Sequence, residues 1–385
     1  MAEPTPGKKV IDLVRRPMPA QPADERSHNF TEVALGYTLE LATEEARRCL
    51  DCKMPRCMDG CPVNVDIPGF IRELAKGDLR GAVTTLREHN LLPAICGRVC
   101  PQENQCEAVC NLVKRGASVA IGRLERFVAD MAAMDSLTEP PKPATPSGKK
   151  VAVVGSGPAG LTCACDLLRL GHQVTVYEAL HEPGGVLIYG IPEFRLPKHI
   201  VRREIDQIRA MGAEIVCDFV VGQSATLSEL RAEFDAVFVG TGAGLPWFMG
   251  IPGENLVGVM SANEYLTRVN LLKAYQRGAA TPVPKPRVAA IVGAGNVAMD
   301  AARTALRLGA KEVHIVYRRS RDEVPARAEE VEHAEEEGII FDFLTLPVAF
   351  GGENGRLTSI TCQRQQLGEP DERGRRSPQP IEGSE

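Results

Sequence analysis

The sequence predicts a cysteine-rich helical domain, followed by an α/β region that contains two Rossmann-like nucleotide-binding domains. Eight of the twelve cysteines lie between residues 49 and 110. A βαβ glycine fingerprint spans residues 150–178, and a second one begins near residue 286. From these three observations we expect domain boundaries at 1–140, 148–250 and 251–385.

The first fingerprint starts with an apolar run at 151–154, which is typical of a buried parallel strand. A G-x-G-x-x-G turn, a helix-periodic stretch (161–170) and a second strand (173–177) follow. The glycines permit a tight turn, close approach to a pyrophosphate and close packing of the helix, whose N-terminus favours negative charge. A glycine-rich turn can precede any helix, but here the acid after the second strand is also correctly placed for a ribose hydroxyl. The predicted dinucleotide contacts are Gly155, Ser156, Gly157, Pro158, Ala159, Gly160 and Glu178.

Length, charge and hydropathy narrow the class of protein. A chain of 385 residues can bury two or three domain cores. The net charge of −5 provides no basic field for nucleic acid or an anionic membrane. Apolar runs of membrane-spanning length and the apolar core of a secretory signal are not found in the sequence. We therefore expect a cytoplasmic protein.

The clustered cysteines form two groups with different spacing. The first is C-x2-C-x4-C-x3-C followed by Pro62, and the second is C-x3-C-x5-C-x3-C. Zinc sites usually show two C-x2-C pairs, and disulfides are disfavoured in the expected compartment, so iron–sulfur clusters fit best. Two groups imply two clusters, and in two-cluster ferredoxins the fourth cysteine of each run ligates the other cluster. The groups are Cys49, Cys52, Cys57 and Cys61, and then Cys96, Cys100, Cys106 and Cys110.

Local patterns predict the other elements of the first 149 residues. Residues 1–30 are expected to form an extended arm, followed by a helical pattern to residue 42. Thr43 is expected to cap a helix that leads to Cys49. Asp66 and Asp78 are placed to cap helices over 67–75 and 79–88. Residues 135–149 carry four prolines and predict an interdomain linker.

A further glycine-rich stretch follows Glu178. In flavin-binding chains, a pair such as Gly184–Gly185 lets the backbone run alongside the isoalloxazine, although an ordinary Pro-Gly turn has the same composition. A helix is expected over 199–211 and a buried strand over 235–239. The glycines at 240–242 follow the carboxyl end of that strand, where open α/β sheets bind ligands.

The second fingerprint differs from the first at its far end. A strand over 288–292 leads into Gly293, Gly295 and Asn296, with Ala298 replacing the third glycine, and then a helix over 297–308. The next strand, 313–316, ends in Arg318 and Arg319 instead of an acid. Arginines pair with a 2′-phosphate, so this domain is expected to prefer NADPH to NADH, the alternative being a solvated basic surface.

The chain resembles the small flavin and iron–sulfur subunit of NADPH-dependent glutamate synthase. Related chains are the ferredoxin–NADP transhydrogenase large subunit, the sulfide dehydrogenase subunit and the amino-terminal half of dihydropyrimidine dehydrogenase. The matching stretches are CLDCKMPRCMDGCPVNVDIPGFI, LPAICGRVCPQENQCEAVCN, AIGRLERFVAD, VAVVGSGPAGL, GGVLIYGIPEFRLPK, VGAGNVAMDAAR and VYRRSRDEVPAR. The resemblance thus implies an α-helical iron–sulfur domain followed by FAD- and NADPH-binding domains, with FAD, NADPH and two [4Fe-4S] clusters as cofactors.

The resemblance also implies site residues. One cluster would be ligated by Cys49, Cys52, Cys57 and Cys110, and the other by Cys61, Cys100, Cys106 and Glu125, with Cys96 as a neighbour that is not a ligand. The FAD site would include Gly190, Ile191, Arg195 and Gly242, and the NADPH site Val297. Hydride passes between cofactors, so no catalytic side chain is expected. Cys163 and Cys165, two residues apart in one helix, are expected to be small core residues.

The family continues beyond the NADPH domain with a return segment to the FAD domain, whereas this sequence ends at RRSPQPIEGSE. We therefore expect a truncated chain with an exposed sheet edge and weakened FAD binding. The implied activity is electron entry in a hetero-oligomer, whose large subunit makes glutamate from glutamine and 2-oxoglutarate. Alternatives are a subunit of a transhydrogenase or sulfide dehydrogenase linked to ferredoxin, and an inactive cluster-bearing fragment.

Overall fold

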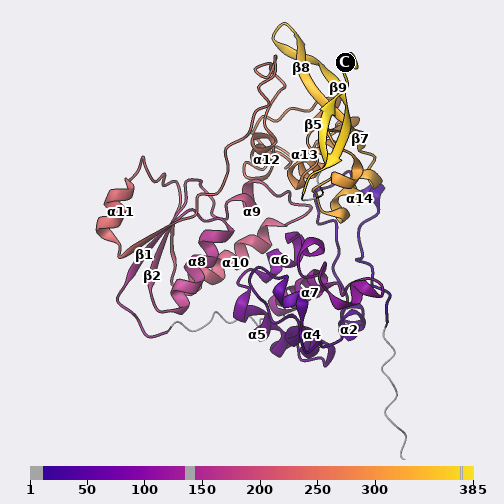
Figure 1. Ribbon diagram of the computed structural model, residues 1–385. Helices are drawn as coiled ribbons and strands as arrows, with labels where there is room; N and C mark the ends of the chain where they lie inside the picture. The colour runs from indigo at the N-terminus through magenta and orange to yellow at the C-terminus, as the bar shows by residue number, and fades with distance from the viewer. Residues whose placement is uncertain (1–11, 135–143, 373, 375) are drawn as a thin grey trace, which may run out of the picture. The chain divides into compact units, whose positions relative to one another are not determined.

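The computed structural model describes residues 12–134, 144–372, 374 and 376–385. The chain forms two compact units (Figure 1). Unit 1 comprises Met1–Ala20 and Ala34–Pro141, and unit 2 comprises Gln21–Val33 and Lys142–Glu385. Most of the predicted 135–149 linker and the first residues of the predicted arm lie outside the described residues.

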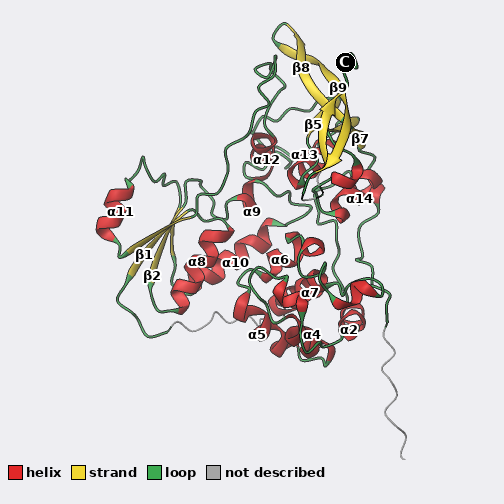
Figure 2. Cartoon of the chain, viewed as in Figure 1, coloured by secondary structure: helices red, strands yellow, loops and turns green. Residues whose placement is uncertain are grey.

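The described secondary structure of unit 1 is helical (Figure 2). Its apolar core is formed by one face of each of the longer helices, with Phe70, Leu74, Leu86, Leu124 and Val128 all essentially inaccessible to solvent. The elements are α2 (Leu39–Arg47), α3 (Arg56–Asp59), α4 (Ile67–Ala75), α5 (Leu79–His89), α6 (Pro93–Val99), the 3₁₀ turns η1 (Gln102–Asn104) and η2 (Asn111–Lys114), and α7 (Ile121–Met134).

Two predicted helix starts are confirmed and one is wrong. Asp66 accepts a hydrogen bond from Gly69 N–H and Asp78 from Gly81 N–H, both at 2.9 Å, at the beginnings of α4 and α5. Thr43 lies inside α2, which begins after Thr38. Thr38 Oγ1 accepts from Leu41 N–H at 3.3 Å. The predicted helical run from residue 30 does not form because the backbone turns at Gly36, where φ is +83°.

The predicted arm is only partly extended, because residues 23–26 form the short helix α1 (Ala23–Arg26).

Unit 2 contains two parallel sheets. The first sheet has the order β3-β2-β1-β4, and its register places Val151 opposite Val174 on one side and Ala236 on the other. Its elements are β1 (Lys150–Val154), α8 (Pro158–Arg169), β2 (Gln173–Tyr177), α9 (Val186–Tyr189), α10 (Lys198–Ala210), β3 (Glu214–Val216), α11 (Leu227–Glu233) and β4 (Ala236–Val239). The predicted strands and helices of this region are confirmed to within a few residues.

The second parallel sheet has the order β5-β6-β7. It is followed in the chain by a separate antiparallel sheet of order β10-β9-β8, which the sequence patterns did not predict. Met299, Ala302, Val313 and Ile315 form part of its core. The elements are α12 (Ala262–Asn270), β5 (Val288–Val292), α13 (Asn296–Arg307), β6 (Glu312–Tyr317), η3 (Arg321–Glu323), α14 (Ala328–Glu336), β7 (Ile340–Phe343), β8 (Thr345–Glu353), β9 (Arg356–Pro370) and β10 (Arg376–Pro380). Among the described residues, no helix is both long and apolar enough to span a bilayer.

Candidate functional site

The first glycine turn lies between β1 and α8 and has room for a ligand at one position only. A Cβ on Gly155 would lie 2.4 Å from Gly240 O, and one on Gly160 would lie 1.9 Å from Gly155 O, so neither position tolerates a side chain. A Cβ on Gly157, in contrast, would meet no described atom within 4 Å. Helix α8 begins directly after Gly157. Backbone N–H groups and the positive end of a helix therefore face an open cradle that suits a pyrophosphate.

Three of the predicted contact residues are joined by hydrogen bonds. Glu178 Oε2 accepts from the backbone N–H of Ser156 at 3.0 Å and from its hydroxyl, and Glu178 Oε1 accepts from Leu180 N–H at 2.9 Å. Ser156 Oγ in turn accepts from Gly184 N–H at 2.8 Å. Both Ser156 and Glu178 are buried. The acid is thus held between the first glycine turn and the glycine pair that follows it.

The predicted flavin-side loop is fixed by two residues that sequence reasoning missed. The buried Lys198 Nζ donates to the carbonyl oxygens of Leu187 (2.9 Å), Leu196 (3.0 Å) and Ile191. Asn270 Nδ2 donates to Gly190 O at 3.1 Å. Burial lowers the pKa of Lys198 to about 7. A lysine within a largely apolar, glycine-bearing stretch was the available signal for such a role.

Arg195 and Gly242, also predicted at the FAD site, have different surroundings. Arg195 Nη1 donates to both carboxylate oxygens of Asp300 at 2.8 Å, and its Nε lies 3.0 Å from Glu330 Oε1. The structure therefore joins Arg195 to α13 and α14, in the second nucleotide-binding region. Gly242 lies in an exposed stretch after β4 with φ at +72°.

The second glycine turn lies between β5 and α13. Gly293 has φ at +109°, and its N–H donates to Val316 O on β6 at 2.9 Å. A Cβ on Gly295 would meet no described atom within 4 Å, so this turn too presents open backbone. Asn296 Oδ1 accepts from Arg327 N–H at 3.0 Å, and Val297 is half-exposed.

The two predicted phosphate-binding arginines follow β6 at the same edge of the sheet. Arg318 is exposed, and Arg319 is half-buried with its carbonyl oxygen accepting from Leu344 N–H at 3.1 Å. The loop beyond them is held by Glu323, which accepts from Ser320 Oγ at 2.5 Å and Arg376 Nε at 2.6 Å. Guanidinium groups beside a dinucleotide turn are suited to a 2′-phosphate.

Unit 1 contains a cavity whose lining includes four cysteines. Its apolar wall includes Ile67, Ile71 and Ile121. Asn111 Nδ2 donates to Cys52 Sγ at 3.3 Å. Burial and the neighbouring thiols raise the pKa of Cys57 to about 12, as expected for thiols that need a cationic centre to become thiolates. The four cysteines are Cys49, Cys52, Cys57 and Cys110, the set that the resemblance assigns to one cluster.

The remaining predicted ligands form a second group, in which Cys106 and Glu125 are buried. Burial, followed by the charge of Glu125, raises the pKa of Cys96. The pKa of Cys106 is raised by burial first, then by the charges of Glu107 and Glu125. Glu125 is itself buried, which raises its pKa to about 8, and Asn90 Nδ2 donates to its Oε1. Cys61 and Cys100 also raise the pKa of the Cys96 and Cys106 thiols. The structure therefore brings Cys96 and Glu125 together and supplies Asn90, which the sequence did not indicate.

Within the described ranges, no three His, Cys, Asp or Glu side chains converge closely enough to bind a single metal ion. The twelve cysteines, all of which are described, form no disulfide. Cys165 is buried with its Sγ 3.6 Å from Met211 Sδ, as expected for a small core residue, whereas Cys163 is only half-buried.

Two protein families match the two regions of the chain. Residues 26–137 match dihydropyrimidine dehydrogenase domain II, 4Fe-4S cluster, and residues 149–369 match pyridine nucleotide-disulphide oxidoreductase. The glutamate synthase [NADPH] small chain of Halomonas elongata is 38% identical over 379 residues, which is 98% of this chain and 80% of that protein. The chain belongs to the glutamate synthase small-chain family. These matches confirm the predicted fold class and the prediction of iron–sulfur, flavin and pyridine-nucleotide cofactors.

Relatives outside this group are also similar. The NADP(+)-dependent formate dehydrogenase subunit beta of Moorella thermoacetica is 40% identical over 352 residues, which is 86% of this chain but 48% of that protein. The solved structure of Mycobacterium tuberculosis FprA in complex with NADPH has a TM-score of 0.52 at 22% identity, covering 63% of this chain and 68% of that one. This structural likeness shows that the fold is shared.

Proposed function

We propose that the chain is an NADPH-dependent electron-entry subunit that carries FAD and two [4Fe-4S] clusters and delivers single electrons to a protein partner. The observation that carries the proposal is the presence of two open glycine turns in unit 2 together with two groups of cysteines in unit 1. When bound, FAD exchanges a hydride with nicotinamide and releases electrons singly, which is the chemistry that one-electron iron–sulfur carriers require.

The side chains of unit 2 would serve to bind and orient the cofactors. Glu178, held by Ser156, would accept hydrogen bonds from the FAD ribose, and Gly157 would admit the pyrophosphate. In the second site, the turn at Gly295 would admit the pyrophosphate of NADPH. The exposed Arg318 would bind the 2′-phosphate, which NADH lacks. Lys198 would hold the loop beside the flavin in one conformation through its three carbonyl contacts.

In unit 1, the thiols would provide the cluster ligands. The cavity lined by Cys49, Cys52, Cys57 and Cys110 would hold one cluster. Cys61, Cys100 and Cys106 would hold the other cluster together with Glu125. Glu125 is buried and accepts a hydrogen bond from Asn90, which distinguishes it from a solvent-exposed glutamate on a helix surface. Twelve cysteines without a disulfide among the described residues are typical of a reducing compartment, and we infer that the protein works in the cytoplasm.

The partner that we propose is a large glutamate synthase subunit, which would use the electrons to make glutamate from glutamine and 2-oxoglutarate. The high coverage of the Halomonas elongata small chain supports this choice. The similarity to a formate dehydrogenase subunit supports the coarser statement that the chain works with another redox protein in a hetero-oligomer.

An anaerobic titration tests the proposal. The chain is purified with added FAD and titrated with NADPH and, separately, with NADH while its visible spectrum is recorded. We expect NADPH to bleach a flavin band and NADH to be much less effective. Iron–sulfur absorption without a bound, reducible flavin would contradict the proposal for this chain and favour a cluster-bearing fragment that is inactive alone.

A further inference from the structure

The segment Gln21–Val33 belongs to unit 2, although the chain on both sides of it belongs to unit 1. Gln21 N–H donates to Val33 O at 3.0 Å, and Ala20 and Ala34 are paired in an antiparallel bridge. The segment, called here the anchor segment, therefore leaves unit 1 and returns to it at the same place. Its contacts with the rest of unit 2 are of three kinds.

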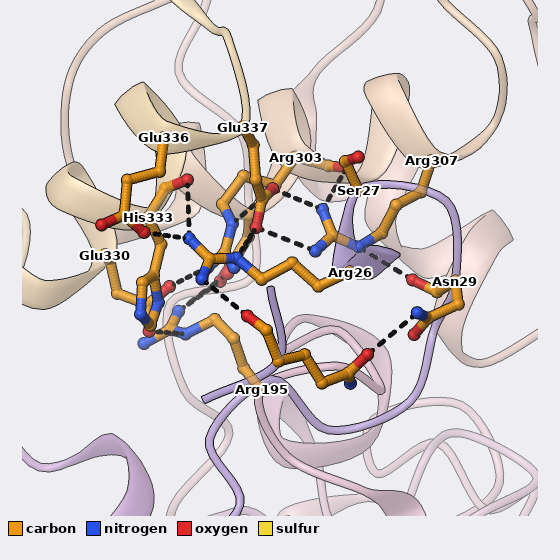
Figure 3. A network of polar contacts seen from close by, with 12 residues as sticks. Arg26, Ser27, Asn29, Arg195, Arg303, Arg307, Glu330, His333, Glu336 and Glu337 are labelled. Carbon is orange, nitrogen blue, oxygen red and sulfur yellow. Dashed lines mark hydrogen bonds and ion pairs between the residues drawn. The ribbon is translucent and has the colours of Figure 1, made fainter. Parts of the chain in front are cut away.

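The first kind is a buried charge network (Figure 3). Arg26 in the anchor segment is 3% exposed, and its Nε lies 3.0 Å from Glu337 Oε1, just beyond α14. Its Nη2 forms a second ion pair with Glu336. The same Glu337 carboxylate accepts from Arg303 Nη2 at 2.8 Å and Arg307 Nη1 at 2.7 Å, both on α13. Three guanidinium groups, one of them from the anchor segment, thus share one buried carboxylate.

The second kind of contact is aromatic. Phe30 stacks on Tyr275 with ring centroids 4.8 Å apart and lies 6.1 Å from the ring of Phe194. The guanidinium carbons of Arg307 and Arg303 lie 4.0 and 4.9 Å from the centroid of the Phe194 ring. Because cations are attracted to aromatic faces, the ring links the anchor segment to the charge network.

The third kind is hydrogen bonding to the backbone. Val33 N–H donates to Phe194 O at 2.9 Å, and Arg307 Nε donates to Asn29 O at 3.0 Å. The segment is also ordered internally, since Gln21 Nε2 donates to Glu32 O at 2.7 Å and Thr31 N–H donates to Asn29 Oδ1 at 2.9 Å. A loop that is already shaped loses little conformational entropy when it binds.

We infer that the anchor segment is a built-in docking peptide. Its receptor is the surface formed by α13, the end of α14, Phe194 and Tyr275. It holds the cysteine-rich unit and the nucleotide-binding unit in one assembly independently of the chain connection at residues 135–149. Arg26 is the central contact, because removing one partner of a buried ion pair leaves the opposing charge buried and poorly compensated. If the proposed function holds, the anchor keeps electron donor and acceptor from separating, but the inference itself requires no cofactor.

Cleavage of the connection tests the inference. A protease recognition site is inserted between residues 135 and 149 of the full chain, the folded protein is cut, and the products are run on size exclusion and native mass spectrometry. We expect the two fragments of the otherwise unchanged chain to remain together. Arg26→Ala should weaken their association at least about hundredfold. Phe30→Ala should also weaken their association.

The matched control is Arg209→Ala, which removes an exposed arginine paired with Asp206 on α10 and should leave the fragments associated. Circular dichroism of each uncut variant shows that it is folded before cleavage. Separation of the unchanged chain after cutting would overturn the inference. So would continued association in both the Arg26→Ala and the Phe30→Ala variants, because other contacts would then hold the fragments.

Discussion

Glu337→Gln is the substitution for which the structure predicts the clearest loss of stability. The carboxylate is fully buried and accepts hydrogen bonds from Arg26, Arg303 and Arg307. Burial alone would raise its pKa, but the hydrogen bonds from Arg307 and Arg303 outweigh burial and lower the pKa to about 2 from an ordinary 4.5. Glutamine has almost the same shape but no charge, so the three guanidinium groups lose their shared partner.

The size of the effect follows from the pKa. A tenfold change in proton affinity corresponds to about 1.4 kcal/mol, so lowering the pKa of Glu337 from 4.5 to about 2 corresponds to about 3 kcal/mol of stability at neutral pH. Breaking a buried ion pair by removing one partner costs about 3–5 kcal/mol, which agrees. We therefore expect Glu337→Gln to lower the free energy of unfolding by about 3 kcal/mol.

The assay is urea unfolding at pH 7, followed by circular dichroism. The exposed Glu382→Gln serves as the matched control and should change the free energy of unfolding by less than about 0.5 kcal/mol. Because the pKa of Glu337 is depressed in the folded protein, this stabilisation is complete above pH 4.5 and is lost as the pH falls toward 2. The difference in unfolding free energy between the unchanged protein and Glu337→Gln should therefore shrink over that window. Equal unfolding free energies for Glu337→Gln and the unchanged protein at pH 7 would refute the reasoning.

Three further substitutions test the cofactor sites. Cys110→Ser should reduce iron per chain by about half, because one of two proposed clusters loses a ligand, and Cys163→Ser should leave iron unchanged. Gly295→Ala should raise the Kd of NADPH at least about tenfold by blocking backbone approach to the pyrophosphate. Its thermal unfolding should not change, because the added Cβ meets no described atom. Arg318→Ala should raise the Kd of NADPH about 10- to 100-fold and leave that of NADH unchanged, since a charged hydrogen bond contributes about 1.5–3 kcal/mol. Iron assays and equilibrium titrations measure these outcomes, and equal losses of NADPH and NADH affinity in Arg318→Ala would contradict the assignment.

Elements with a strong local signal could be predicted from the sequence. Asp66 and Asp78 precede amphipathic runs and cap their helices as expected, and both glycine fingerprints form the predicted turns. The predicted cap at Thr43 was wrong because α2 begins earlier, at Leu39 after the Thr38 cap, shortly after the chain turns at Gly36.

Contacts that depend on distant residues could not be predicted. Arg195 lies within a motif typical of flavin-binding chains, but its carboxylate partner Asp300 is 105 residues away and gives no local signal. Arg26 meets Glu337 across 311 residues, and the role of the segment around it became visible only in the fold. The long strand β9 carries mixed polar residues and lacks the regular alternation that would have marked it.

The most direct measurement of the central claim is electron paramagnetic resonance of the anaerobic protein, frozen after mixing with NADPH. Electron entry through flavin to the clusters predicts the loss of flavin absorbance together with the appearance of signals from reduced [4Fe-4S] clusters, which NADH should produce far less effectively. Dithionite-reducible clusters that remain oxidised after NADPH has fully reduced the flavin would contradict electron delivery from unit 2 to unit 1.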